Sequence, residues 1–211
     1  MKKIIITIDG PAASGKGKIA NYISKKWNLK HLDSGILYRR IAFNLLQNRI
    51  NLESIKDIKK NINNQKNLSF KKNKKIRSEK ISNAASKIAV LSFVRNYVNK
   101  FQKEFVKRGI KEKGFVIDGR DIGSVVFKKA DLKLYIDVNE ENRAKRRYKQ
   151  LIDTGEKSIY RTLLKEIKLR DNIDKTRKVS PLVVPKGSYI IDNNGTFSKT
   201  TKQINNLIKA L

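Results

Sequence analysis

Short apolar runs, each followed by a stretch with helical spacing, recur along the chain. The first, at residues 3–8, is unbroken and rich in β-branched side chains. Similar runs lie at 114–118, 132–138 and 189–192, with a weaker one at 29–32. Continuous apolar runs of this length are typical of parallel strands that are buried on both faces. The pattern therefore predicts five strands.

Between these runs, apolar side chains recur at spacings of three and four residues, which marks one face of a helix. One such face carries Ile19, Ala20, Ile23 and Trp27, and a second carries Leu91, Val94, Val98, Phe101 and Phe105. Asn139 and the two glutamates after it supply a cap and an acidic first turn for a helix through residues 143–151. Strands that alternate with helices form βαβ units. We therefore predict an α/β fold with a five-stranded parallel sheet and helices on both faces.

Two stretches depart from this alternation. Residues 51–80 are rich in lysine and asparagine and have weak apolar spacing, so we expect an insertion on the surface of the core. Residues 148–160 contain Thr154-Gly155-Glu156 between two helical segments, which favours a mobile flap.

The composition narrows the class of protein. The 211 residues suit one domain, and the absence of cysteine excludes disulfides, thiolate zinc sites and cysteine nucleophiles. No apolar stretch approaches the roughly 20 residues of a membrane span, so we expect a soluble cytoplasmic protein. The net charge of +30 would ordinarily suggest a nucleic-acid partner. However, the lysines are scattered, and a protein that handles phosphates needs a positive cleft in any case, so we do not expect nucleic acid as the main partner.

A glycine-rich loop follows the first predicted strand and opens the first predicted helix. Its glycines allow a tight turn in which successive amides point at phosphate oxygens, and the helix N-terminus adds a partial positive charge. Lys16 is expected to reach the β- and γ-phosphates of ATP. An incidental Gly-rich turn is the alternative, but strand, spacing and helix together favour a P-loop. The predicted ATP-binding residues are Gly10, Pro11, Ala12, Ala13, Ser14, Gly15, Lys16, Gly17 and Lys18.

The loop departs from the general motif directly after its lysine. Many P-loop proteins place a Ser or Thr hydroxyl there to hold Mg²⁺, whereas this chain has Gly17 and then Lys18. Gly-Lys-Gly resembles the nucleoside-monophosphate kinases, which usually continue with Thr. An ammonium group at position 18 could still contact phosphate.

Polar segments also follow two other predicted strands. Asp33-Ser34-Gly35 with Tyr38-Arg39 follows the weak strand, and residues 118–123, Asp-Gly-Arg-Asp-Ile-Gly, follow the third. The carboxyl edge of a parallel sheet is where α/β proteins form ligand sites. An Arg-Asp pair flanked by glycines suits an arginine on a phosphate and a carboxylate on an exocyclic amine or a ribose hydroxyl.

Together these segments resemble the bacterial cytidylate kinases, which transfer the γ-phosphoryl group of ATP to CMP or dCMP. The matching segments run in family order over nearly the whole chain: residues 8–11, 32–35, 83–86, 118–123 and 179–182. The resemblance implies a single P-loop kinase domain over 1–211. It also implies a short acceptor-binding insertion at about 36–82 and a LID-like arginine flap at about 143–160.

The resemblance assigns roles residue by residue. It implies that Ser86, Arg95 and Asp121 read the cytosine edge. It also implies that Arg39, Arg120 and Arg177 hold the phosphate of CMP and that Asp174 and Arg170 face the ribose. Asp33, Ser34 and Tyr38 would line the same pocket. Arg143, Arg146 and Arg147 resemble the arginines that close over the donor phosphates, so the catalytic set becomes Lys16, Arg120, Arg177, Arg143 and Arg147. The implied cofactor is Mg²⁺ carried with ATP, without protein ligands that can be named, and we expect a monomer.

Each assignment has a structural alternative. Arg170, Asp174 and Arg177 share a helical face and could form an exposed ion-pair ladder, while Asp33 could simply cap the next helix. His31 is interpreted as structural.

Ser86 and Arg95 are nine residues apart, which on an unbroken helix puts them on opposite sides. We therefore predict a break near Leu91–Phe93, with Ser92 capping the new helix.

Overall fold

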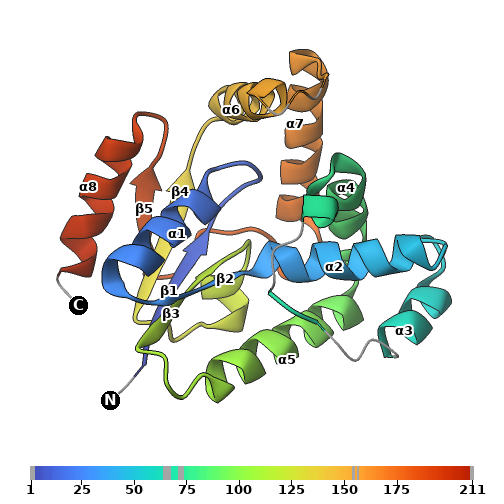
Figure 1. Ribbon diagram of the computed structural model, residues 1–211, viewed down its shortest axis with the longest axis horizontal. Coiled ribbons are helices and arrows are strands. Elements are labelled where there is room, and N and C mark those ends of the chain that lie inside the picture. The colour runs from blue at the N-terminus through green and yellow to red at the C-terminus, as the bar shows by residue number, and fades with distance from the viewer. Residues whose placement is uncertain (1–2, 64–67, 71–73, 154, 156, 210–211) are drawn as a thin grey trace. The chain divides into compact units, whose positions relative to one another are not determined.

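The computed structural model describes residues 3–63, 68–70, 74–153, 155 and 157–209. The strands are β1 (Ile4–Asp9), β2 (Lys30–Asp33), β3 (Gly114–Asp118), β4 (Leu132–Asp137) and β5 (Tyr189–Asp192). The α-helices are α1 (Lys16–Trp27), α2 (Ser34–Gln47), α3 (Ile55–Asn63), α4 (Glu79–Ile88), α5 (Ser92–Arg108), α6 (Glu140–Asp153), α7 (Tyr160–Thr176) and α8 (Phe197–Ile208). A 3₁₀ turn, η1 (Lys74–Arg77), and a π-helical turn, η2 (Ile122–Val126), complete the described elements (Figure 1).

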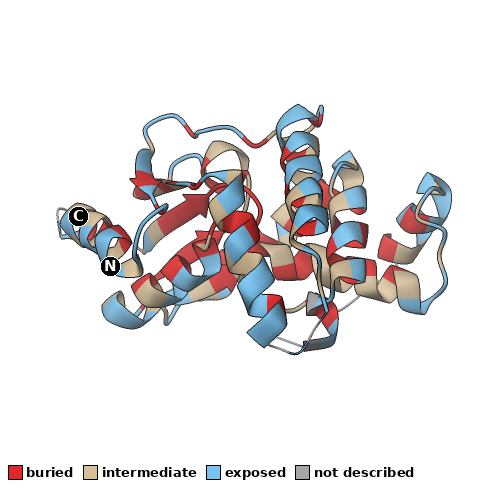
Figure 2. Ribbon diagram, turned by 90° about the horizontal axis from the view of Figure 1, so that it is seen from above, coloured by how far each residue is buried: buried red, intermediate tan, exposed pale blue. Residues whose placement is uncertain are grey.

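The chain divides into two compact units, each with its own hydrophobic core. The sheet unit comprises Met1–His31 and Glu112–Leu211, and the helical unit comprises Leu32–Lys111. Buried residues, red in Figure 2, gather along the strands of the sheet unit and along one face of many of the helices. The helical unit is longer than the predicted insertion at about 36–82 because it also includes α5.

The sheet has the strand order β2-β3-β1-β4-β5. β1 lies at its centre and pairs in parallel with β3 on one side and with β4 on the other, and β4 pairs in parallel with β5. Ile6 and Ile8 are fully buried, as expected for a central strand covered on both faces. The predicted five-stranded parallel sheet is confirmed, and it places the carboxyl ends of β1, β3 and β4 next to one another.

The core of the sheet unit joins the strands to α1 and α8. Ile19 and Ile23 of α1 and Ile204 of α8 are fully buried in the same cluster as the strand residues. Tyr22, Trp27 and Phe197 pack beside it with edge-to-face ring contacts. This packing fixes the start of α1, and therefore the phosphate loop, on the sheet.

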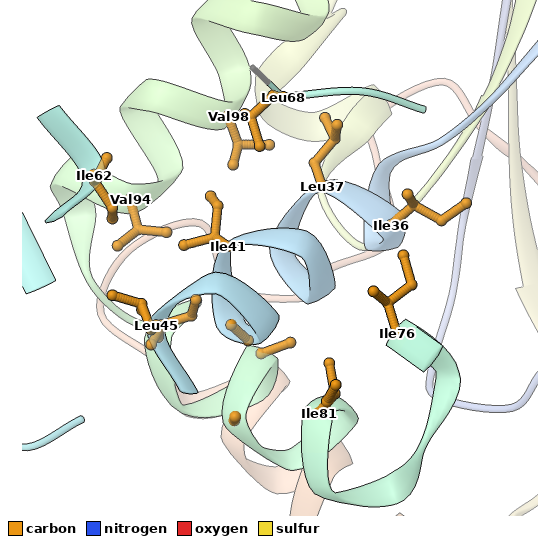
Figure 3. Close-up of a cluster of buried hydrophobic side chains, with 14 of the residues drawn as sticks. Ile36, Leu37, Ile41, Leu45, Ile62, Leu68, Ile76, Ile81, Val94 and Val98 are labelled. Carbon is orange, nitrogen blue, oxygen red and sulfur yellow. The ribbon is translucent and has the colours of Figure 1, made fainter. Parts of the chain in front are cut away.

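The core of the helical unit is built from four helices and the segments between them. Figure 3 shows Ile36, Leu37, Ile41 and Leu45 of α2 surrounded by side chains from the neighbouring elements. Ile58 and Ile62 of α3, Leu68 and Ile76 belong to the same cluster. The prediction that residues 51–80 lie on the surface of the core is therefore wrong. Several of their apolar side chains are buried in the helical unit, and the polar residues around them hide the spacing.

The helix break is confirmed, because α4 ends at Ile88 and α5 begins at Ser92. The predicted cap is wrong: Leu91 occupies the cap position with extended backbone and makes no side-chain capping bond, and Ser92 is the exposed first residue of α5. Ser86 and Arg95 therefore lie on two different helices, α4 and α5.

The segment from α6 to α7 contains the predicted flap. Asn139 caps α6, because its Oδ1 accepts a hydrogen bond from the Asn142 backbone N–H at 2.8 Å, as predicted. α6 ends at Asp153 and α7 begins at Tyr160, and Thr154 and Glu156 lie outside the described residues. None of the helices in the described ranges is long and apolar enough to cross a membrane.

Candidate active site

The phosphate loop leaves β1 and turns through glycines whose conformations no other residue could adopt cheaply. Gly10 has φ +149°, and a Cβ there would come within 2.6 Å of the Ile136 carbonyl oxygen. Gly15 has φ +86° and precedes α1, whose first turn has neither a side-chain cap nor an acidic residue. The first amides of α1 are thus left for an anionic ligand, as the motif predicts.

Lys16 is buried at the start of α1 and turns back over the loop. Its ammonium donates to the Pro11 carbonyl at 2.6 Å and to Ser14 Oγ at 3.0 Å. Burial lowers the pKa of Lys16 well below its ordinary value, and the nearby Arg120 guanidinium lowers it further. A phosphate beside this ammonium would have the opposite effect, because an anion favours the charged form.

Ala12, inside the loop, is held through both of its backbone polar groups. Its N–H donates to Asp171 Oδ1 at 3.2 Å, and its carbonyl accepts from Arg143 at 2.9 Å. Arg143 and Asp171 are themselves paired at 2.5 Å, and both are almost fully buried. Arg143, predicted to close over the donor phosphates, is thus engaged in shaping the loop. Asp171 balances the charge of Arg143.

Asp171 was not predicted from the sequence. Its partners lie 159 residues earlier in the loop and on another helix, so no local spacing marks it. The one available signal was its place between Arg170 and Asp174, two residues that the resemblance assigns to the acceptor.

We expect Asp171→Asn to lower the free energy of unfolding by about 2 kcal/mol, because it leaves the buried Arg143 guanidinium without its counter-charge. Urea denaturation at neutral pH measures the change. Glu141→Gln is the matched control, since Glu141 is exposed on α6, and it should shift stability by less than about 0.5 kcal/mol. Equal effects of the two substitutions would show that the Arg143–Asp171 pair contributes nothing.

Asp174 joins two of the arginines predicted to hold the acceptor phosphate. Its Oδ2 accepts from Arg120 Nε at 2.8 Å and its Oδ1 from Arg177 at 3.0 Å. Burial alone would raise the pKa of Asp174, but the two guanidinium groups outweigh burial and lower it. Asp174 and Arg177 are both buried, so the alternative of an exposed ion-pair ladder on α7 is wrong. The cluster carries a net positive charge and is pre-organised for an anion.

Asp118 ends β3 beside the phosphate loop. Its Oδ1 is hydrogen-bonded to His31 Nε2 at 2.6 Å, which gives His31 the structural role predicted for it. The other oxygen, Oδ2, lies 4.0 Å from where a Cβ on Gly17 would stand. A carboxylate therefore faces the position at which other P-loop proteins carry a Mg²⁺-binding hydroxyl.

The helical unit carries the other predicted acceptor residues. Arg95 of α5 is almost fully buried, donates to the Ala89 carbonyl at 2.9 Å and lies 5.5 Å from the ring centre of Tyr38. Asp33 caps α2 by accepting from the Ile36 N–H at 3.2 Å, so its structural alternative is observed. Ser34 is buried, while Arg39 and Ser86 are half-buried on α2 and α4. Two of the predicted acceptor residues, Tyr38 and Arg95, are thus in contact.

Lys18, Arg146 and Arg147, all predicted to contact the donor phosphates, contact other protein groups in the structure. The Lys18 ammonium lies 4.2 Å from the ring centre of Phe197, a cation–π contact with α8. Arg146 donates to the carbonyls of Asn193 and Gly195, at 2.7 and 3.2 Å. Arg147 donates to Gln150 on the same helix. Lys18, which stands where nucleoside-monophosphate kinases usually carry Thr, therefore packs against α8.

The sheet unit therefore assembles one polar site at the carboxyl ends of β1 and β3. The phosphate loop, Lys16, Arg120, Asp174 and Arg177 share it, and Asp121 is buried directly after Arg120. Loop amides, an ammonium and clustered guanidiniums can bind polyphosphates and stabilise charge that develops on a transferring phosphoryl group.

The sequence matches a known family over most of its length. A family model described as "Cytidylate kinase" matches residues 6–210. A protein named "Cytidylate kinase" from Rickettsia felis is 41% identical over 205 residues, covering 97% of this chain and 91% of the relative. Another of that name from Rickettsia canadensis is 43% identical over 189 residues, covering 90% of this chain and 84% of the relative.

Solved structures show the same fold at low identity. A protein from Eubacterium ventriosum matches with a TM-score of 0.56 at 15% identity, with 99% of both chains covered. A gluconokinase from Sinorhizobium meliloti matches with a TM-score of 0.50 at 11% identity, again with 99% of both chains covered. These likenesses concern the fold alone, and they agree with the α/β architecture described above.

Proposed function

The chain belongs to the cytidylate kinase family, and from this premise we propose that it transfers the γ-phosphoryl group of ATP to CMP and dCMP, giving CDP and dCDP. The observation that carries the proposal is the pairing of two features in the sheet unit. A phosphate loop follows the central strand, and an arginine–carboxylate cluster gathers at the end of the neighbouring strand. The first suits the donor and the second suits a phosphate-bearing acceptor.

For the donor, we propose that the loop amides and Lys16 hold the β- and γ-phosphates of ATP. Lys16 would exchange its bonds to Pro11 and Ser14 for phosphate oxygens, which are stronger acceptors. The Arg143–Asp171 pair would keep Ala12 in place, so that the loop amides stay directed at the phosphates.

The donor set also fits Mg²⁺. Asp118 offers an oxygen beside Gly17, and Mg²⁺ prefers one or two carboxylates together with substrate phosphates and water. In the described part of the chain, no cluster of three or more acidic or histidine side chains forms a separate metal cage. We propose that Asp118, oriented by His31, holds the ion. When bound with ATP, Mg²⁺ neutralises charge on the phosphate oxygens.

For the acceptor, we propose that Arg120 and Arg177 hold the phosphate of CMP while Asp174 keeps both guanidiniums in place. Asp121 would accept from the exocyclic amine of cytosine. The helical unit carries the other residues that the resemblance assigns to CMP, namely Ser34, Arg39, Ser86 and the pair of Arg95 and Tyr38.

The reaction needs no protein nucleophile. An oxygen of the CMP phosphate attacks the γ-phosphorus of ATP in line, the bond from that phosphorus to the β–γ bridging oxygen breaks, and ADP leaves. The residues named above bind and orient the two substrates and stabilise the transition-state charge. We propose that a single chain in the cytoplasm suffices for this reaction.

A substrate panel tests this function. ADP release is measured with CMP, dCMP, UMP, AMP and GMP at equal concentrations, with ATP alone as the control for hydrolysis. We expect kcat/KM for CMP and dCMP to exceed the purine values about a hundredfold or more, because the larger purines place their amine elsewhere than the position at which the site is built to bond the cytosine amine. A preference for AMP or GMP would replace the assignment by another monophosphate kinase. Activity with none of the five would overturn it.

A further inference from the structure

The carboxylate of Asp9 reaches across from the central strand to the loop that follows β3. Its Oδ1 accepts from the Ile122 N–H and its Oδ2 from the Gly123 N–H, both at 2.7 Å. Asp9 is fully buried, and it directly precedes Gly10, where the phosphate loop begins. One side chain thus ties the donor loop to the segment that carries Arg120 and Asp121.

We propose that Asp9 is a positioning residue for the reaction: its two hydrogen bonds hold the Arg120–Asp121 segment in the orientation that the acceptor nucleotide requires. The inference rests on the proposed function, since it assigns the acceptor to this segment. Asp9 itself touches neither substrate, because both of its oxygens are occupied by backbone donors.

The space around Gly123 shows that the loop after β3 packs closely against β1. A Cβ on Gly123 would lie 2.7 Å from Thr7 Oγ1 and 3.1 Å from Asp9 Oδ2, so position 123 lies too close to β1 for any side chain. The loop continues into the π-helical turn η2, which begins at the bonded Ile122. A rare turn held at its first two amides by a buried carboxylate is typical of a functional site.

Electrostatics show that this arrangement is costly to the fold. Burial raises the pKa of Asp9 to about 6, although the N–H donors of Gly123 and Ile122 oppose the change. The facing carboxylate of Asp121 raises it further and the Lys16 ammonium lowers it. A buried carboxylate without an ion pair weakens the fold, so its hydrogen bonds are expected to serve a purpose other than stability. Holding the acceptor segment is such a purpose.

The decisive variant is Asp9→Asn, which keeps the side-chain volume but turns an NH₂ group toward one of the two donors. Asp131→Asn is the matched control. Asp131 Oδ2 accepts from the Ile5 N–H at 2.8 Å on the same strand, at the end far from the phosphate loop. Gly123→Ala tests the contact from the other side, because its methyl group would push the loop off Asp9.

Hydrogen exchange of the unliganded proteins gives a readout that does not depend on activity. We expect the Ile122 and Gly123 amides to exchange at least tenfold faster in Asp9→Asn and in Gly123→Ala, and at the wild-type rate in Asp131→Asn. Unchanged protection in Asp9→Asn would overturn the inference.

Steady-state kinetics give the second readout. In Asp9→Asn we expect KM for CMP to rise about tenfold and KM for ATP to change less than threefold, while Asp131→Asn leaves both unchanged. Equal effects on CMP and ATP would show a general loss of structure and would also overturn the inference. If the wild-type protein phosphorylates no monophosphate, the proposed function fails, and the exchange data alone then decide whether Asp9 holds the loop.

Discussion

Lys16→Met is expected to lower kcat for CMP phosphorylation by about 10²- to 10³-fold at saturating ATP, because it removes a cation aimed at the developing phosphoryl charge. Methionine fills much of the volume of the lysine chain and leaves the loop glycines intact. The ammonium is buried, and burial lowers its pKa, so the fold gains little from the charge. The variant should therefore keep the melting temperature of the wild type.

Kinetics and melting must be measured on the same preparation. Loss of turnover with unchanged melting temperature identifies Lys16 as a residue that acts on the phosphates, and Lys16→Arg should recover only part of kcat because its planar fork differs from a point charge. Near-normal kcat in Lys16→Met would remove Lys16 from the catalytic set.

Asp121→Ala is expected to lower kcat/KM for CMP about a hundredfold and to leave KM for ATP nearly unchanged, because a base whose amine loses a buried acceptor binds poorly. Asp121 is itself buried, directly between Arg120 and the two amides that Asp9 binds. The same variant measured with ATP as the varied substrate serves as the internal control.

Asp121→Asn separates recognition of the base from charge. The amide can still accept from the cytosine amine, or can turn and donate to the carbonyl oxygen of uracil, so the preference for CMP over UMP should fall while activity with CMP partly recovers. Equal losses with CMP and ATP in Asp121→Ala would mean that Asp121 supports the loop and does not read the base.

The sheet could be predicted from the sequence because its strands are buried on both faces. The run at 114–118 coincides with β3 and the run at 189–192 with β5, and the other three strands lie within one residue of their predicted bounds. The break before α5 was predicted because the resemblance assigns Ser86 and Arg95 to one base, which an unbroken helix would not allow. By contrast, the prediction for residues 51–80 was wrong because a segment needs few apolar positions to join a core. Here Ile58, Ile62 and Ile76 are part of the core of the helical unit.

The residues of the site that lie in motifs could be predicted from the sequence, whereas the residues that hold those motifs in place could not. Lys16, Arg120, Asp174 and Arg177 belong to recognisable segments, and the sheet unit brings them together. Asp9 lies in the matching segment 8–11 but had no predicted role, and Asp171 belongs to no motif, since their partners are 113 and 159 residues away. The contact between Lys18 and Phe197 could not be predicted for the same reason, because the two residues are far apart in the sequence.

The bond from Ala12 to Asp171 has a consequence for synthesis on the ribosome. At about 5–20 residues per second, the loop waits roughly 8 to 32 seconds for the residue that completes it. The helical unit is continuous in sequence and can collapse during that interval, whereas β1 remains without β3 and β4 until residues beyond 112 emerge. A nascent chain released early would therefore carry an exposed, apolar first strand, which makes truncated products of this protein prone to aggregate.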